Sequence, residues 1–179
     1  CARGEGPLRA TQGELGAKSH AATCDLADEA AIRASIAAAA AALGGIDILV
    51  NNASGFGTTD DAAGWAARVA VDLMAIVHAT HAALPWLEKA RGAAVVSVSS
   101  ISAYRVSLRN PPYGAIKAAV NHYTATQATA LAAKGIRVNA VAPGSIEFPG
   151  GSWEQRKLAG DPLYERVRGR IAAGHLGTP

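Results

Sequence analysis

The sequence predicts an α/β fold: a doubly wound parallel sheet with helices on both faces. Short apolar, β-branched runs alternate with longer alanine-rich stretches along the 179 residues, and strands that alternate with helices favour a parallel sheet. Half of the residues are hydrophobic and only 5% are aromatic, which suits an alanine-rich core. The length predicts a single domain, residues 1–179.

The expected strands are short runs of apolar or β-branched residues bounded by turn formers. The run Ala93-Ala-Val-Val-Ser-Val98 is the clearest, because strands buried on both faces are almost continuously apolar. Loops that leave the carboxyl ends of parallel strands are where α/β proteins place their sites. The expected strands are the end of one at residues 1–3 and further strands at 18–23, 46–50, 93–98 and 136–141.

The expected helices lie between these strands. An alanine run within residues 27–43 predicts a helix, since alanine is the best helix former, and Gly44 ends it. Pro111 and Pro112 open another helix, because proline suits the first turn. The expected helices are residues 27–43, residues 60–90 with Pro85 near the end, residues 111–133, and pieces of 152–173 broken at Gly160 and Pro162.

Composition argues against several classes of function. The net charge is only +3, and no basic block is present, so we expect neither nucleic-acid nor membrane binding. The two cysteines lack metal-type spacing and no signal peptide is visible, so a cytoplasmic location is expected. The five histidines show no ligand spacing either, and no metal site is predicted.

The strongest chemical signal is Tyr113 followed by Lys117, with Ser100 directly after the expected strand 93–98. Residues four apart share one face of a helix, so the Lys117 ammonium lies beside the Tyr113 phenol and favours its phenolate form. Such a phenol can act as a general acid and base. The hydroxyl of Ser100 can hold a carbonyl or alcohol oxygen beside it. The pattern indicates an oxidoreductase that interconverts a carbonyl and an alcohol.

The chain resembles the short-chain dehydrogenase/reductase family in several segments that occur in family order. They are Cys24-Asp25-Leu26, Ile46-Asp-Ile-Leu-Val-Asn-Asn-Ala-Ser54, the set Ser100, Tyr113 and Lys117, and Ile136-Arg-Val-Asn-Ala-Val-Ala-Pro-Gly144. The resemblance implies a Rossmann-like fold, a nicotinamide cofactor and hydride transfer to or from a small carbonyl or alcohol substrate. The turn Glu147-Phe-Pro-Gly-Gly-Ser-Trp153 is similar to that of 3-oxoacyl-carrier-protein reductase-like members, so 3-oxoacyl thioesters are one expected substrate.

The resemblance also assigns residues. Ser100, Tyr113 and Lys117 become catalytic, with Asp72 as a fourth member. Arg3 stands where NAD-preferring members carry an acidic residue, and its cation favours NADP, with NAD as the alternative. The expected cofactor-binding residues are Arg3, Asp25, Leu26, Asn52, Ala53, Ser54, Tyr113, Lys117, Pro143, Gly144 and Ile146.

Three positions depart from the family pattern. Asp72 replaces an Asn that helps to hold a water beside the lysine; either Asp72 serves in that proton relay or it only ties down a helix kink, and its charge disfavours a phenolate on Tyr113. Ser54 replaces a Gly, so either a positive φ is strained there or the loop differs. Phe148 stands where a Thr often contacts the nicotinamide amide.

The resemblance further implies a homodimer or homotetramer that assembles through the helices 60–90 and 111–133. The family's Gly-rich turn would precede Cys1, and its last helix and strand would follow Pro179, so the chain is expected to be a fragment truncated at both termini. Two alternatives remain: a nucleotide-binding regulatory or scaffold protein with an impaired site, and an inactive fragment of the reductase. The substrate itself is not predicted.

Overall fold

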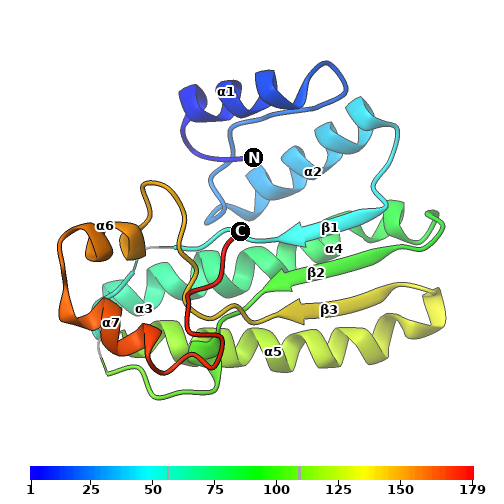
Figure 1. Cartoon of the computed structure of the whole chain (residues 1–179). Coiled ribbons are helices and arrows are strands. Elements are labelled where there is room, and N and C mark those ends of the chain that lie inside the picture. Colours follow the sequence, from blue (N-terminus) through cyan, green and yellow to red (C-terminus); the bar gives the residue numbers. More distant parts are fainter. Residues whose placement is uncertain (56, 109) are drawn as a thin grey trace. The chain divides into compact units, whose positions relative to one another are not determined.

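Three parallel strands form the sheet in the computed structural model, which describes residues 1–55, 57–108 and 110–179 (Figure 1). They are β1 (Ile48–Asn51), β2 (Ala94–Val98) and β3 (Arg137–Val141), hydrogen-bonded in that order. Leu49 pairs with Val95, and Val95 pairs with Val138. Adjacent parallel strands need helical crossovers, and the chain supplies them, so the α/β class with a parallel sheet is confirmed.

The chain divides into two compact units, Cys1–Val141 and Ala142–Pro179, which we describe separately. The first unit contains the sheet and most of the helices. Its helical elements are α1 (Glu5–Leu15), α2 (Glu29–Leu43), α3 (Ala62–Arg68), the π-helix η1 (Val69–Met74), α4 (Ala75–Leu87), the 3₁₀ turn η2 (Ile101–Ala103), α5 (Pro111–Leu131) and the 3₁₀ turn η3 (Ala132–Lys134). The expectation of one domain stays a prediction.

The core of the first unit lies between the sheet and three helices. Leu49, Val95 and Val138 form one buried row across the strands and join a cluster with side chains of α2, α4 and α5. Alternation along a strand sends the intervening residues to the opposite face, where Ile48 is 59% and Val50 58% exposed. The helices that share this core therefore cover one face of the sheet.

Local chemistry explains where the main helices begin. The Asp28 side chain accepts hydrogen bonds from the amides of Ala30 and Ala31 at the start of α2, and Asn110 accepts one from the Tyr113 amide at the start of α5. Such N-caps satisfy amides that have no partner within the helix. The expected helices 27–43 and 111–133 are thus present, each shortened by two residues.

Two parts of the first unit differ from expectation. The expected strands 1–3 and 18–23 are reduced to a single parallel bridge between Ala2 and Thr23. The segment after Arg3 forms α1, which the sequence analysis missed; its Gly6, Pro7 and Gly13 are poor helix formers, and no residue of α1 is buried.

The expected helix 60–90 is interrupted by the π-helix η1. One helical run of this region, Ala62–Leu87, is long and apolar enough to cross a membrane by length and composition alone. Six residues of α4 are buried, and four of them belong to the core cluster. Packing against the sheet therefore accounts for the apolar character of this run.

The second unit contains α6 (Ser152–Leu158) and α7 (Pro162–Arg168), as the expected break at Gly160 and Pro162 requires. Gly160 has φ +64°, a conformation that glycine adopts without strain. Tyr164 and Lys157 both donate to Glu147, at 2.6 and 2.7 Å. These two donors hold the pKa of Glu147 below its ordinary value, the Lys157 bond contributing most.

We predict that Leu87→Ala destabilises the first unit by about 2–5 kcal/mol, since it removes buried methyl groups and leaves a cavity. Leu87 is 1% exposed. The matched control is Leu43→Ala at the end of α2, where the side chain is 54% exposed and the loss should stay within about 0.5 kcal/mol. Urea unfolding of both variants measures the difference; equal losses would contradict the placement of the core.

Candidate active site

The loop that follows β2 presents Ser99 and Ser100 at the carboxyl end of the sheet. The Ser99 amide continues the ladder by donating to the Val141 carbonyl at 2.8 Å. Ser100 is the N-cap of η2, and its Oγ accepts the Ser102 amide hydrogen at 3.1 Å. Since Oγ already accepts one bond, its own proton is free to be directed at a substrate oxygen.

The first turn of α5 packs closely against this loop. A Cβ atom on Gly114 would lie 3.0 Å from the Ser102 carbonyl oxygen, so glycine permits the close approach. Tyr113 and Lys117 then lie one turn apart on α5, and the Lys117 Nζ is 5.7 Å from the centre of the Tyr113 ring. The structure thus brings the expected tyrosine and lysine together, beside the loop that carries Ser100.

Lys117 is buried and held at two points. Its side chain is 3% exposed, and Nζ donates to the Val98 carbonyl at 2.9 Å. Nζ also lies 3.3 Å from Asp72 Oδ1. A buried ammonium requires such partners because burial penalises its charge.

Asp72 is completely buried on η1 and accepts hydrogen bonds from the turn after β1. The Ser54 hydroxyl donates to Oδ1 and the Gly55 amide to Oδ2, both at 2.6 Å. A Cβ atom on Gly55 would lie 3.2 Å from Oδ2, so the turn has little room for a side chain. Asp72 therefore does more than fix the π-helix: it joins that helix to the turn and to Lys117.

Arg68 is a member of this cluster that the sequence analysis missed. It is 4% exposed and forms an ion pair with Asp72 at 3.2 Å. It also donates to the Gly57 carbonyl at 2.6 Å and to Ser54 Oγ at 2.8 Å. Its guanidinium carbon lies 4.8 Å from the centre of the Tyr113 ring, within the range of a cation–π contact. The i, i+4 spacing of Arg68 and Asp72 was the available signal.

Ser54 is accommodated without backbone strain. Among the described residues, only glycines have a positive φ, so Ser54 does not adopt the conformation that would favour glycine. Its hydroxyl takes part in the cluster instead, between Asp72 and Arg68. The strain that a positive φ would impose on Ser54 is therefore absent.

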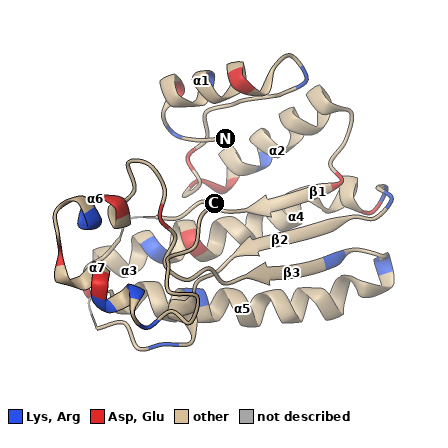
Figure 2. Cartoon of the chain, viewed as in Figure 1, with Lys and Arg blue, Asp and Glu red and all other residues tan. Residues whose placement is uncertain are grey.

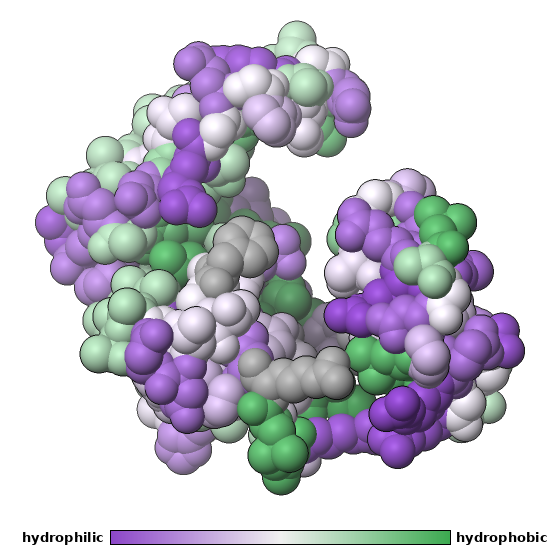
Figure 3. Space-filling view, turned by 90° about the vertical axis from the view of Figure 1, so that its left-hand side faces the viewer, coloured by the Kyte–Doolittle hydropathy of each residue, from purple (hydrophilic) through white to green (hydrophobic). Residues whose placement is uncertain are grey.

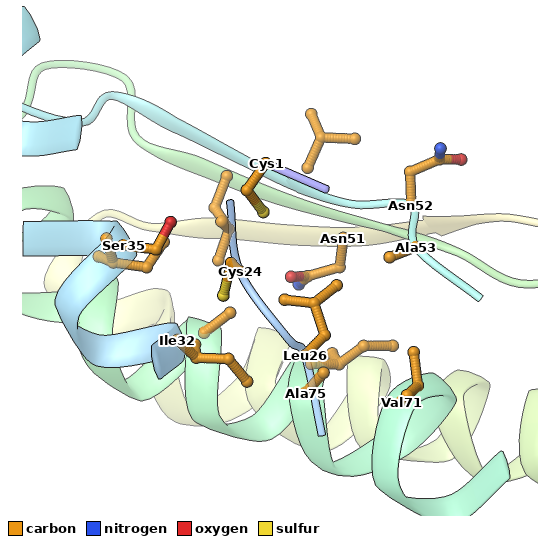
Figure 4. Close-up of a pocket in the computed structure, with 15 residues that line it drawn as sticks. Cys1, Cys24, Leu26, Ile32, Ser35, Asn51, Asn52, Ala53, Val71 and Ala75 are labelled. Carbon is orange, nitrogen blue, oxygen red and sulfur yellow. The ribbon is translucent and has the colours of Figure 1, made fainter. Parts of the chain in front are cut away.

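Two cavities in the first unit gather most of the expected cofactor-binding residues. The larger, of about 770 Å³, is lined by Arg3, Asp25, Leu26, Ala53 and Ser54, among others. The smaller, of about 290 Å³, shares Leu26 and Ala53. Figure 4 shows its lining, with Asn52 and Ala53 following Asn51 in the turn after β1. Asp25 Oδ1 accepts the Ala27 amide hydrogen at 3.0 Å, which orders the loop before α2.

Pro143, Gly144 and Ile146 belong to the second unit, so the structure does not relate them to these cavities. Within that unit Ile146 pairs with Gly177 in a parallel bridge. Phe148 is 48% exposed and contributes to a separate cavity of about 310 Å³ with Glu147, Tyr164 and others. Their expected contacts with a cofactor stay predictions.

Charged and hydrophobic residues are distributed over many parts of the chain. Figure 2 shows acidic and basic residues spread over many helices and loops. On the face shown in Figure 3, hydrophilic and hydrophobic residues are interspersed. Within residues 1–55, 57–108 and 110–179, no group of three or more His, Cys, Asp or Glu side chains is placed to hold a metal ion. The cluster around Tyr113 and the two cavities are therefore the candidate site.

Comparison with known proteins gives consistent matches. The model of the short chain dehydrogenase family matches residues 1–157. Isoepoxydon dehydrogenase of Penicillium expansum is 34% identical, covering 87% of the chain but only 60% of that enzyme. A putative ketoacyl reductase of Streptomyces coelicolor is 32% identical, over the whole chain and 74% of the relative. An NADPH-bound short chain oxidoreductase of Pseudomonas aeruginosa, described as having an atypical catalytic center, superposes with a TM-score of 0.85 at 33% identity, covering 100% of the chain and 74% of that structure.

Proposed function

Because the chain belongs to the short chain dehydrogenase family, we propose that it is part of an NADP(H)-dependent oxidoreductase that interconverts a carbonyl and an alcohol. The observation that carries the proposal is the position of Tyr113. It lies one helical turn from the buried Lys117 and beside the loop of Ser100. A phenol between a cation and a hydroxyl is suited to proton transfer at a substrate oxygen. The relative named ketoacyl reductase supports 3-oxoacyl thioesters as the substrate class.

In the direction of reduction, the Tyr113 hydroxyl gives its proton to the substrate oxygen, and in oxidation it takes the proton back. Ser100 directs its own proton to the same oxygen and orients it. The Lys117 ammonium stabilises the phenolate that remains. Its bonds to the Val98 carbonyl and Asp72 hold it in place during the reaction. A nicotinamide cofactor would supply or accept the hydride.

The larger cavity has the chemistry that such a cofactor needs. Its volume of about 770 Å³ lies within the usual range for a ligand pocket, roughly 300–1,000 Å³. Arg3 offers a cation for a ribose 2′-phosphate, and Asp25 offers carboxylate oxygen to an adenine amino group. Ala53 and Ser54 are small and leave room beside the turn. Asn52, Pro143, Gly144 and Ile146 complete the set of proposed contacts.

We predict that Tyr113→Phe lowers turnover by about 10²-fold or more, because it removes the proton donor and keeps the ring. The matched control is Tyr123→Phe on the same helix, whose buried hydroxyl has no hydrogen-bond partner among the described residues. Steady-state rates with a carbonyl substrate and NADPH compare the two. Near-normal turnover of Tyr113→Phe would rule out the proposed proton transfer.

Arg3→Ala should weaken NADP(H) binding by about 1.5–3 kcal/mol, the scale for a lost hydrogen bond to a charged group. Binding of NAD(H) should hardly change, since it lacks the 2′-phosphate. Arg9→Ala on α1 is the control, because the Arg9 side chain forms an ion pair with Glu5 and does not line the cavity. Calorimetric titration with both cofactors measures the difference; equal losses for the two would exclude the role of Arg3.

The protein is further proposed to be a homodimer or homotetramer in the cytoplasm. Small exposed side chains follow one another along α5, which permits the close approach of a second helix. They are Ala115, Ala118, Ala125, Thr126, Thr129 and Ala130, with the larger His122 exposed among them.

Ala118→Glu should shift the assembly towards the monomer, because it places a long charged side chain in that contact. Sedimentation equilibrium at micromolar concentration tests this expectation. The control is Ala30→Glu in the first turn of α2, where an exposed acidic residue is tolerated. A parent protein that is already monomeric would refute the proposed assembly.

A further inference from the structure

Three charged side chains surround the Tyr113 ring or its immediate partners. Arg68 and Lys117 are cations, 4.8 and 5.7 Å from the centre of the ring. Asp72 lies between them, 3.2 Å from Arg68 and 3.3 Å from Lys117. Among the described residues of this cluster, two positive charges and one negative charge leave a net charge of +1. The turn η2 packs against α5 and adds no charge, because its side chains are Ile101, Ser102 and Ala103.

Burial strengthens the effect of these three charges on one another and on Tyr113. The side chains of Arg68, Asp72 and Lys117 are 5%, 0% and 3% exposed, so water screens their charges weakly. Without Arg68, the carboxylate of Asp72 would neutralise Lys117 and leave the phenol with no net cation nearby. The family pattern with Asn in place of Asp72 needs no second cation, because Lys117 alone then provides the +1. Arg68 offsets the additional charge that Asp72 introduces.

We propose, on the premise of the function above, that Arg68 is a positioning residue: together with Asp72 it keeps one net positive charge beside Tyr113 and so sustains the phenolate required for proton transfer. It acts through the face of the ring and through Asp72. Its bonds to Gly57 and Ser54 fix the guanidinium in this place.

The test compares the parent with Arg68→Met, Asp72→Asn and the double variant. Ring-labelled tyrosine is titrated by NMR, and the signal of Tyr113 is assigned with Tyr113→Phe among the four tyrosines. Arg68→Met should move the titration midpoint of that signal up by about 1 pH unit or more, the size of shift that a charge within about 4–6 Å produces. Asp72→Asn should move it down, and the double variant should return close to the parent. Arg33→Met, whose exposed arginine pairs with Glu29 on α2, should leave it unchanged.

The pH profile of turnover should move in parallel with the titration, a result that a merely structural role for Arg68 would not produce. If Arg68→Met does not fold, Arg68→Lys replaces it: it keeps the charge, so the midpoint should stay, while Asp72→Asn still lowers it. An unchanged midpoint in folded Arg68→Met, or in Asp72→Asn, would overturn the proposal. So would a double variant that behaves as Arg68→Met does. The titration needs neither substrate nor cofactor, so shifted midpoints without turnover would support the charge balance and reject the proposed function alone.

Discussion

The buried carboxylate of Asp72 is the constraint on which the rest of the site depends. It accepts bonds from the turn after β1, pairs with Arg68 one helical turn before it, and lies against Lys117 on α5. Burying a carboxylate away from water costs free energy unless several donors surround it. These three segments must therefore all be in place around Asp72. The π-helix η1 is the stretch of backbone that carries Asp72 into this position.

The sheet brings the segments of the site together at one edge. β1 ends just before the turn that contacts Asp72, and β2 ends at Val98, whose carbonyl accepts the Lys117 ammonium hydrogen. Ser100 follows two residues later. Because parallel strands end at one edge of the sheet, the turn, the serine loop and the first turns of α5 converge there. The cavity lined by Arg3 and Asp25 adjoins the same turn through Ala53 and Ser54.

Arg68 changes how the departure at Asp72 is understood. From the sequence, an aspartate here only weakens the case for a phenolate on Tyr113. In the structure its charge is shared between two buried cations, which lie 4.8 and 5.7 Å from the centre of the tyrosine ring. Arg68 and Asp72 form a buried ion pair within a single helical run, so the two residues are best considered together.

The sequence by itself determined the α/β class, the order of strands and helices, and the helical spacing of Tyr113 and Lys117, because periodicity, capping and i, i+4 geometry are local properties. It also indicated the residues that now line the cavities, through their motifs. Only the tertiary structure decided that the strand 18–23 is a single bridge, that residues 5–15 form a helix, and that Ser54 avoids a positive φ. The same holds for Arg68, since the charge beside a side chain depends on which groups burial brings within a few ångströms, and no local pattern contains that information.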